Sequence, residues 1–146
     1  MVQQTVAKGV VIFTCLVLAG LGYVYALEER HEIKELEGIR YYIADTDEKR
    51  ISGLSNFKPL KDHEAMLFVF EEPAKYNFWM KDMNFSIDII WLNEKREIIT
   101  VYEGVTPDTY PQIFSPDKSA LYVIEGNAGF FKRQGWVKGG AVSLPL

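Results

Sequence analysis

The uncharged run from Gly9 to Leu27 constrains this chain more than any other sequence feature. A helix of 19 residues rises about 28 Å, close to the hydrocarbon thickness of a bilayer. Lys8 precedes the run and two glutamates follow it, and a positive flank favours the cytoplasmic side of a membrane. We therefore expect a cytoplasmic N-terminus over residues 1–8, a transmembrane anchor over 9–27, and a C-terminal domain outside the cytoplasm.

Signal-peptide cleavage after Ala26 is the alternative, because Val24 and Ala26 satisfy the small-residue rule for such a site. The apolar core of a signal peptide is usually about 7–15 residues long. The longer run therefore favours an uncleaved, single-pass anchor in the cell membrane. In either case we expect a charged juxtamembrane segment over 28–38 and one periplasmic or extracellular domain over 39–146.

Charge and cysteine content narrow the function classes. The chain carries 16 basic and 20 acidic residues, for a net charge of −4. An acidic domain lacks the basic surface that nucleic acids require, so we expect no nucleic-acid partner. The single cysteine, Cys15, lies inside the apolar run. The domain is therefore expected to have no disulfide, thiolate metal cluster or cysteine nucleophile, and we expect no metal and no cofactor.

Short runs rich in β-branched and aromatic residues predict a β-rich domain. A turn at Glu37-Gly38 should join the first two strands, and short helices are expected after the N-cap Thr46 and over Ala128–Gln134. The runs AMLFVF and IDIIWL are apolar at nearly every position, so both faces of their strands should be covered. We therefore expect an all-β domain, a β-sandwich or small barrel with one or two short helices. The expected strands are His31–Leu36, Ile39–Ala44, Ala65–Phe70, Tyr76–Met80, Ser86–Leu92, Glu97–Tyr102, Leu121–Glu125 and Ala141–Leu144.

Four segments carry a more specific signal: IADTDEKRISGLS, AMLFVFEEP, FWMKDMNFSIDIIWLNEKREI and LYVIEGNAGFFKRQGWVKGG. In order and spacing they resemble the uncharacterised, often membrane-anchored DUF 192 family, also called uncharacterised protein family 0127. The resemblance runs from about Ile39 to Ser143 and implies an exported all-β domain with no established activity. Ser55 and Ala65 stand where that family usually has Met and Gly, and its C-terminal Gly-Asp is Gly139-Gly140 here.

Asp88 is the leading candidate for a functional side chain, because a carboxylate inside the apolar strand FSIDIIWL needs water, a donor or a cation. Arg50 is its expected partner. The pair is either a structural ion pair or part of a cleft in which Asp88 acts as acid, base or ligand anchor. Asp45 and Glu125 raise the same question. We expect Asp45 to cap the turn into the first helix and Glu125 to end its strand with a hydrogen bond.

Aromatic and methionine side chains give weaker indications. Trp79 and Met80 suggest either core packing or a soft Cu(I) site, and alternation along a strand, which would place them on opposite faces, disfavours the metal. The other side chains of that set are Met66, Met83 and His63. The proline-stiffened loop Val105–Pro116 carries Tyr110 and is either a binding surface or a cover over one end of the barrel.

Taken together, these features predict a membrane-tethered accessory module of the cell envelope that binds an unknown small ligand or an envelope protein. The alternative is a small carboxylate-based envelope hydrolase that uses Asp88. An exposed aromatic patch favours the binding module, whereas an accessible carboxylate beside a second titratable group in a concave pocket favours the enzyme. The residues expected to line or support the site are Asp45, Arg50, Trp79, Met80, Asp88 and Tyr110.

Overall fold

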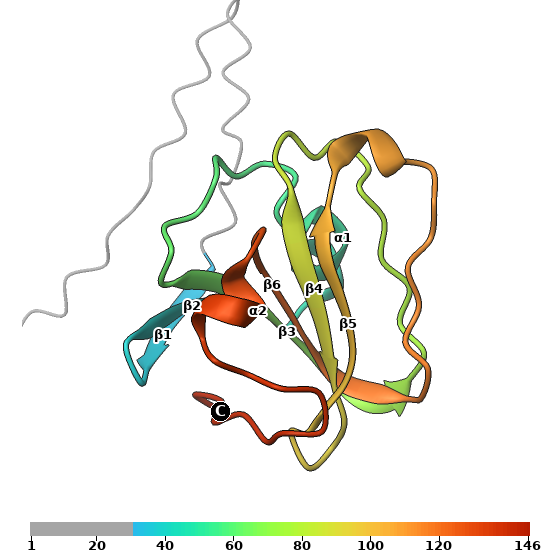
Figure 1. Cartoon of the computed structure of the whole chain (residues 1–146). Coiled ribbons are helices and arrows are strands. Elements are labelled where there is room, and N and C mark those ends of the chain that lie inside the picture. The colour runs from blue at the N-terminus through green and yellow to red at the C-terminus, as the bar shows by residue number, and fades with distance from the viewer. Residues whose placement is uncertain (1–30) are drawn as a thin grey trace, which may run out of the picture.

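The computed structural model describes residues 31–146, which form one six-stranded sheet with two short α-helices and a 3-10 turn (Figure 1). None of the helices within this range is long and apolar enough to cross a membrane. The expected anchor over 9–27 and the alternative cleavage site at Ala26 lie outside the described residues. The elements are β1 Glu32–Leu36, β2 Ile39–Ala44, α1 Asp47–Ser52, β3 Glu64–Ala74, β4 Ile87–Leu92, β5 Ile98–Val105, η1 Pro107–Thr109, β6 Ala120–Asn127 and α2 Phe130–Arg133.

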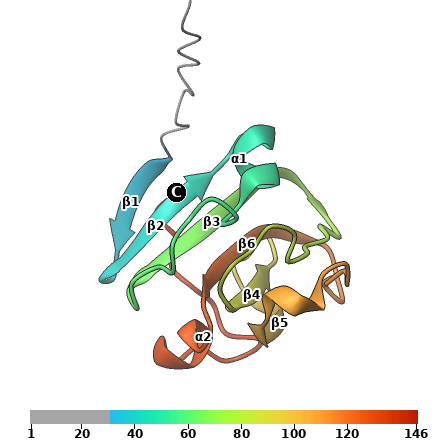
Figure 2. The same cartoon turned by 90° about the horizontal axis from the view of Figure 1, so that it is seen from above.

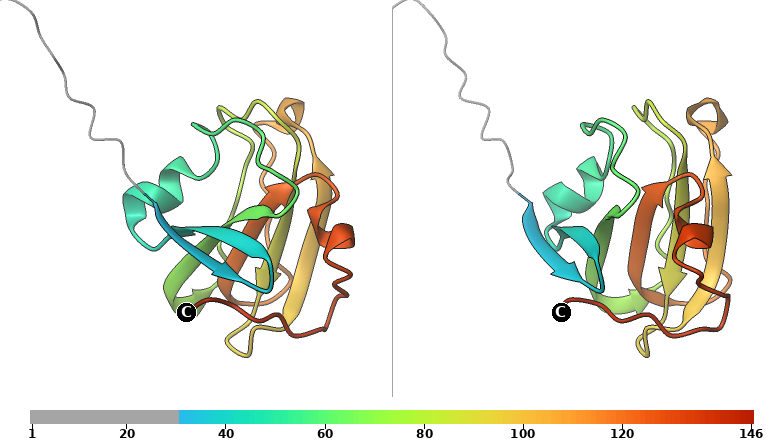
Figure 3. Two further views of the ribbon diagram at one scale, coloured as in Figure 1. Left: turned by 90° about the vertical axis from the view of Figure 1, so that its left-hand side faces the viewer. Right: turned by 60° about the vertical axis from the view of Figure 1, so that its left-hand side comes forward.

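The strands follow the order β1-β2-β3-β6-β4-β5, and β2 and β3 are the one parallel pair in this sheet. The predicted β-rich class and the two short helices are confirmed. Instead of the expected sandwich or closed barrel, the structure has a single open sheet with β1 and β5 at its edges. The sheet is strongly twisted, and α1 and α2 lie on opposite sides of it (Figures 2 and 3).

Both faces of the sheet are covered, as the apolar runs predict. Alternation along β4 sends Ile89 and Trp91 to the face that α1 covers, here called the α1 face. Ile90 and Leu92 point to the opposite face, here called the α2 face, where they pack with Phe130 of α2. A strand with a core on each side has no solvent-facing positions, which explains why β4 is buried along its whole length.

Local sequence explains the β1–β2 hairpin and the start of α1. Glu37 and Gly38 both have positive φ angles, 53° and 78°, as a two-residue hairpin turn of this type requires. Thr46 is the N-cap of α1, and its hydroxyl oxygen accepts a hydrogen bond from the backbone N–H of Lys49 at 3.3 Å. Both features match the sequence prediction.

Two expected strands are wrong. In Tyr76–Met80, Phe78 is the one residue that pairs with another segment of the chain. It forms an isolated antiparallel bridge with Phe114, in which the backbone N–H of each residue donates to the carbonyl oxygen of the other. The aromatic residues there cover the α1 face instead, with Phe78 edge-on against Phe68 and Trp91. In Ala141–Leu144, a single bridge joins Ala141 to Glu97, and the apolar side chains of this segment pack on the α2 face.

Candidate functional site

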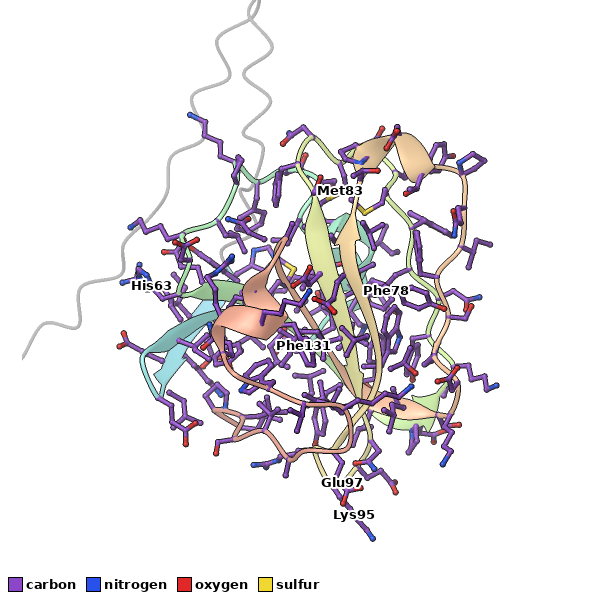
Figure 4. The ribbon with its side chains drawn as sticks, viewed as in Figure 1. His63, Phe78, Met83, Lys95, Glu97 and Phe131 are labelled. Carbon is purple, nitrogen blue, oxygen red and sulfur yellow. The ribbon has the colours of Figure 1, made fainter. Side chains whose placement is uncertain are left out.

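A cleft of about 310 Å³ opens on the α1 face. Its walls come from α1 and the turn after it, from β3 and β6, and from the connection between β3 and β4. Figure 4 labels Phe78 and Met83 of that connection, and Phe131 of α2, which packs on the other face of the sheet. The lining residues are Asp47, Arg50, Ile51, Ser52, Gly53, Leu54, Ser55, Phe68, Phe70, Tyr76, Asn77, Phe78, Trp79, Lys81, Met83 and Glu125.

Glu125 places a carboxyl group in the wall of this cleft. It lies within β6, opposite Met66 of β3 and Ile89 of β4, and 5% of its surface is exposed. Within residues 31–146, no group hydrogen-bonds or ion-pairs with its carboxyl oxygens. Burial raises the pKa of Glu125 from 4.5 to about 8, because no neighbour compensates for the lost solvation of the charged form. The neutral acid is therefore the major form of this side chain at pH 7.

This arrangement differs from the expectation that Glu125 ends its strand with a hydrogen bond. The strand continues to Asn127, and the carboxyl group faces the cleft. The end of α1 lies close to this carboxyl group: an added Cβ on Gly53 would lie 3.7 Å from Glu125 Oε2, an ordinary van der Waals contact. Gly53 ends α1 with a φ of 50°, a conformation that side chains rarely adopt.

Aromatic rings and a fixed guanidinium form the outer wall of the cleft. Phe70 and Tyr76 stack with their ring centroids 3.4 Å apart, and the Arg50 guanidinium lies 5.3 Å from the Phe70 centroid. Trp79 at the rim is 52% exposed. Arg50 is held in place by hydrogen bonds from Nη1 to the carbonyl oxygens of Asp45 and Val69, at 2.9 and 2.7 Å.

The expected ion pair between Asp88 and Arg50 is wrong. Arg50 pairs with Asp47 at 2.7 Å, on the α1 face. Alternation along β4 places Asp88 on the α2 face instead, where its oxygens accept three backbone N–H groups. These are Gly104 at 2.8 Å, Gly129 at 3.1 Å and Phe131 at 3.0 Å.

A β-bulge explains how the Gly104 N–H reaches Asp88. The β4–β5 register shifts between Ile87 and Ile89, and the extra residue in β5 frees this N–H from the ladder. The other two donors are the N–H groups of Gly129, the N-cap of α2, and of Phe131 in its first turn. Asp88 is fully buried, so its carboxylate fastens α2 to the sheet and has no open side for a substrate.

The other candidates occupy separate places. Asp45 pairs with Lys49 Nζ at 2.7 Å instead of capping the turn, and this hydrogen bond lowers the pKa of Asp45. Met80 is 1% exposed and belongs to the core of the α1 face. Tyr110 is 49% exposed on the loop after η1. The structure thus brings Arg50 and Trp79 together in the cleft, and places Asp45, Met80, Asp88 and Tyr110 outside its lining.

Of the residues named for a Cu(I) site, the three methionines belong to or pack against the core of the α1 face, and His63 is exposed. Met66 and Met80 are fully buried in the core of the α1 face, whereas Met83 lines the cleft and His63 is exposed on the loop before β3. Over residues 31–146 no group of three or more His, Cys, Asp or Glu side chains could hold a metal ion.

Sequence reasoning missed the central position of Glu125, although a signal was available. In the run LYVIEGN, Val123 and Glu125 are two residues apart and so point to the same face of a strand. Val123 is fully buried. A glutamate in register with a core valine either has a buried partner or faces a cavity, and here it faces the cleft.

Fold and cleft together define a small, mostly β domain with a partly aromatic side cleft and one buried carboxyl group. The sequence profile of DUF192, a family of uncharacterised proteins, matches residues 29–144. The chain therefore belongs to the DUF192 family, as the four sequence segments indicate. It is 33% identical over 92 residues to the UPF0127 protein TK1120 of Thermococcus kodakarensis, a match that covers 62% of this chain and 55% of that protein.

Two crystal structures have a similar fold. A "putative transcription regulator" from Sinorhizobium meliloti 1021 superposes with a TM-score of 0.65 and 28% identity, over 69% of this chain and 78% of that one. A protein of unknown function from Novosphingobium aromaticivorans DSM 12444 gives a TM-score of 0.68 and 22% identity, over 78% and 92% of the two chains. At that identity the second likeness shows the fold alone.

Proposed function

We propose that this domain binds a small organic ligand in the cleft between α1 and the connection from β3 to β4. The main support for this proposal is the position of Glu125. Its buried carboxyl group faces the cleft and has no hydrogen-bond or ion-pair partner among residues 31–146. A molecule bound in the cleft can hydrogen-bond to this carboxyl group, and such a bond is electrostatically stronger in a poorly hydrated site than in water. The volume of about 310 Å³ lies at the small end of the range for ligand pockets.

The rest of the lining supports a binding role. Exposed apolar side chains flank the mouth of the cleft, with Ile51 84% and Trp79 52% exposed, and such patches are typical of binding surfaces. No observation favours the hydrolase alternative, because Asp88 is buried and fully engaged by backbone N–H groups. The description as a transcription regulator concerns the Sinorhizobium protein, and the net charge of −4 does not favour DNA binding by this chain.

The test is a fragment survey read by amide chemical shifts of the full-length protein. The probes are water-soluble fragments that carry amine, carboxylate, amide or hydroxyl groups. We expect the fragments that bind to shift the amide signals of Gly53, Trp79 and Glu125. If no fragment shifts these signals, or if the shifts gather elsewhere, the cleft is not a ligand site.

Two aromatic variants, one at the rim of the cleft and one away from it, provide a matched comparison. Trp79 and Tyr110 are exposed aromatic residues of similar exposure, 52% and 49%, and Trp79 alone lines the cleft. Trp79→Ala should weaken fragment binding, whereas Tyr110→Ala should leave it unchanged. Equal effects of the two substitutions would contradict the proposed location.

We also propose that the domain is tethered to the cell membrane and lies outside the cytoplasm. The uncharged run from Gly9 to Leu27 and the preceding Lys8 support this proposal. Protease treatment of cells whose outer envelope has been opened and whose cytoplasmic membrane is intact tests it: the domain should be digested while a cytoplasmic marker survives. Protection of the domain until the cells are lysed would contradict it.

A further inference from the structure

We propose that the ligand of the cleft is an organic ammonium ion, a positively charged nitrogen on an apolar carbon frame, whose nitrogen pairs with the Glu125 carboxylate. This inference rests on the proposed ligand-binding function and adds the chemical class of the ligand. Two independent features of the cleft support it: the distribution of charge around Glu125 and the aromatic lining.

The charges around Glu125 leave its carboxyl group without a cation of its own. Its neighbours in the sheet, Met66 and Ile89, are uncharged. On α1, the Arg50 guanidinium is engaged by Asp47 and by two backbone carbonyl oxygens. Lys81, on the connection between β3 and β4, is exposed. A positively charged ligand would therefore provide the counter-ion that the Glu125 carboxylate lacks among its neighbours.

The surroundings of the mouth are acidic. A second depression adjoins the cleft at Arg50 and Tyr76, and it adds Glu71 and Glu72 to the Asp47 that both share. The titratable and charged groups that line the two depressions are therefore Asp47, Glu71, Glu72, Glu125, Arg50, Lys81 and Tyr76. Carboxylates outnumber basic groups in this set, and such a field raises the local concentration of cations.

The aromatic lining suits an ammonium ion on an apolar frame. Five aromatic side chains and the thioether of Met83 line the cleft beside a single buried carboxyl group. Aromatic rings attract cations through their negative faces and also accommodate apolar carbon atoms, whereas a strongly hydrated metal ion would find few oxygen ligands there. The aromatic residues are Phe68, Phe70, Tyr76, Phe78 and Trp79.

The competing possibility is a neutral ligand that hydrogen-bonds to the protonated acid, and pH separates the two. An ammonium ion binds the ionised form of Glu125, whose pKa in the free protein is about 8. Its affinity should therefore rise about tenfold per pH unit from pH 6 towards pH 8, and each binding event should release nearly one proton below pH 8. A neutral ligand that needs the protonated acid would instead bind more weakly above pH 8.

The experiment is calorimetric titration of the full-length protein with two pairs of probes of matched shape. Choline is compared with 3,3-dimethylbutan-1-ol, its uncharged carbon analogue, and benzylammonium with benzyl alcohol. Each titration is run between pH 6 and 9 in two buffers of different ionisation enthalpy, which reports proton release. We expect at least one cation to bind about tenfold or more tightly than its neutral partner at pH 8.

Three variants test whether the cation binding and proton release measured by calorimetry arise in the cleft. Glu125→Gln should abolish both the preference for the cation and the proton release. Trp79→Ala, at the exposed rim, should weaken cation binding but leave proton release in place. Tyr110→Ala should change neither the affinity nor the proton release. Near-UV circular dichroism checks that each variant is folded.

The outcomes separate this inference from the proposed function. Neutral probes that bind as tightly as the cations, with affinity falling above pH 8, would overturn the ammonium assignment and keep the cleft as a ligand site. Cation binding that survives Glu125→Gln, or no cation binding at millimolar concentration, would also overturn the assignment. The fragment survey decides separately whether the cleft binds any ligand.

Discussion

Replacing Glu125 by glutamine should stabilise the protein, although it alters a fully packed strand of the sheet. The carboxyl group ionises at about 4.5 in the unfolded chain and at about 8 in the folded one. Because the folded pKa is raised, the contribution of Glu125 to stability is greatest below pH 4.5 and is lost as the pH rises towards 8. A glutamine side chain does not ionise, so this loss should disappear in the variant.

The magnitude follows from the interval between the two pKa values. Each pKa unit is worth about 1.4 kcal/mol, so the interval from 4.5 to about 8 corresponds to about 5 kcal/mol above pH 8 and about 3 kcal/mol at pH 7. The buried amide and the neutral acid carry similar desolvation penalties. The variant and the natural protein should therefore be almost equally stable near pH 4.

The assay is urea unfolding of the full-length protein and the variant at several values between about pH 4 and pH 8. Glu64→Gln is the control, because Glu64 is equally buried at 5% but pairs with Arg40 at 3.2 Å and accepts the Lys61 N–H at 3.0 Å. This control should destabilise the protein at pH 7 by about 1–3 kcal/mol. Parallel stability curves for the natural protein and Glu125→Gln would refute the assignment of a partnerless buried acid.

Two further substitutions test the contacts that assemble the domain. Asp88→Asn presents an NH2 group to backbone N–H donors and should cost about 3 kcal/mol in urea unfolding, because one charged acceptor of three hydrogen bonds is lost; a loss below about 0.5 kcal/mol would contradict the anchoring role. Gly126→Ala places a Cβ 2.5 Å from Phe130 Cγ and should cost about 1–3 kcal/mol by overpacking. Combining it with Phe130→Ala should destabilise by less than the sum of the two single changes, and strict additivity would contradict this close contact.

Local rules predict much of the fold from sequence. The Glu37-Gly38 turn, the Thr46 cap and the two-sided burial of β4 each depend on a few neighbouring residues, and the structure confirms all three. Tyr76–Met80 is wrong as a strand because strand propensity also describes aromatic residues that pack flat against a sheet. The aromatic residues of this segment cover the sheet, and its strand-like pairing is limited to the single bridge at Phe78.

The candidate site could be predicted less well because its contacts are long-range. The sequence flagged Asp88 as a buried carboxylate but not its partners, since a β-bulge and the start of α2 bring those N–H groups together. Arg50 and Trp79, the polar and the aromatic candidate, both line the cleft. Glu125 becomes significant once the neighbouring strands are known, because their side chains offer it no hydrogen-bond partner.

The central claim is that Glu125 faces the cleft as a buried acid without a partner among residues 31–146. Titration of its side-chain carboxyl carbon by NMR, in the full-length protein without added ligand, tests this claim most directly. We predict a midpoint near pH 8, which choline or benzylammonium should move to lower pH. A midpoint near 4.5, the ordinary value for glutamate, would contradict the account.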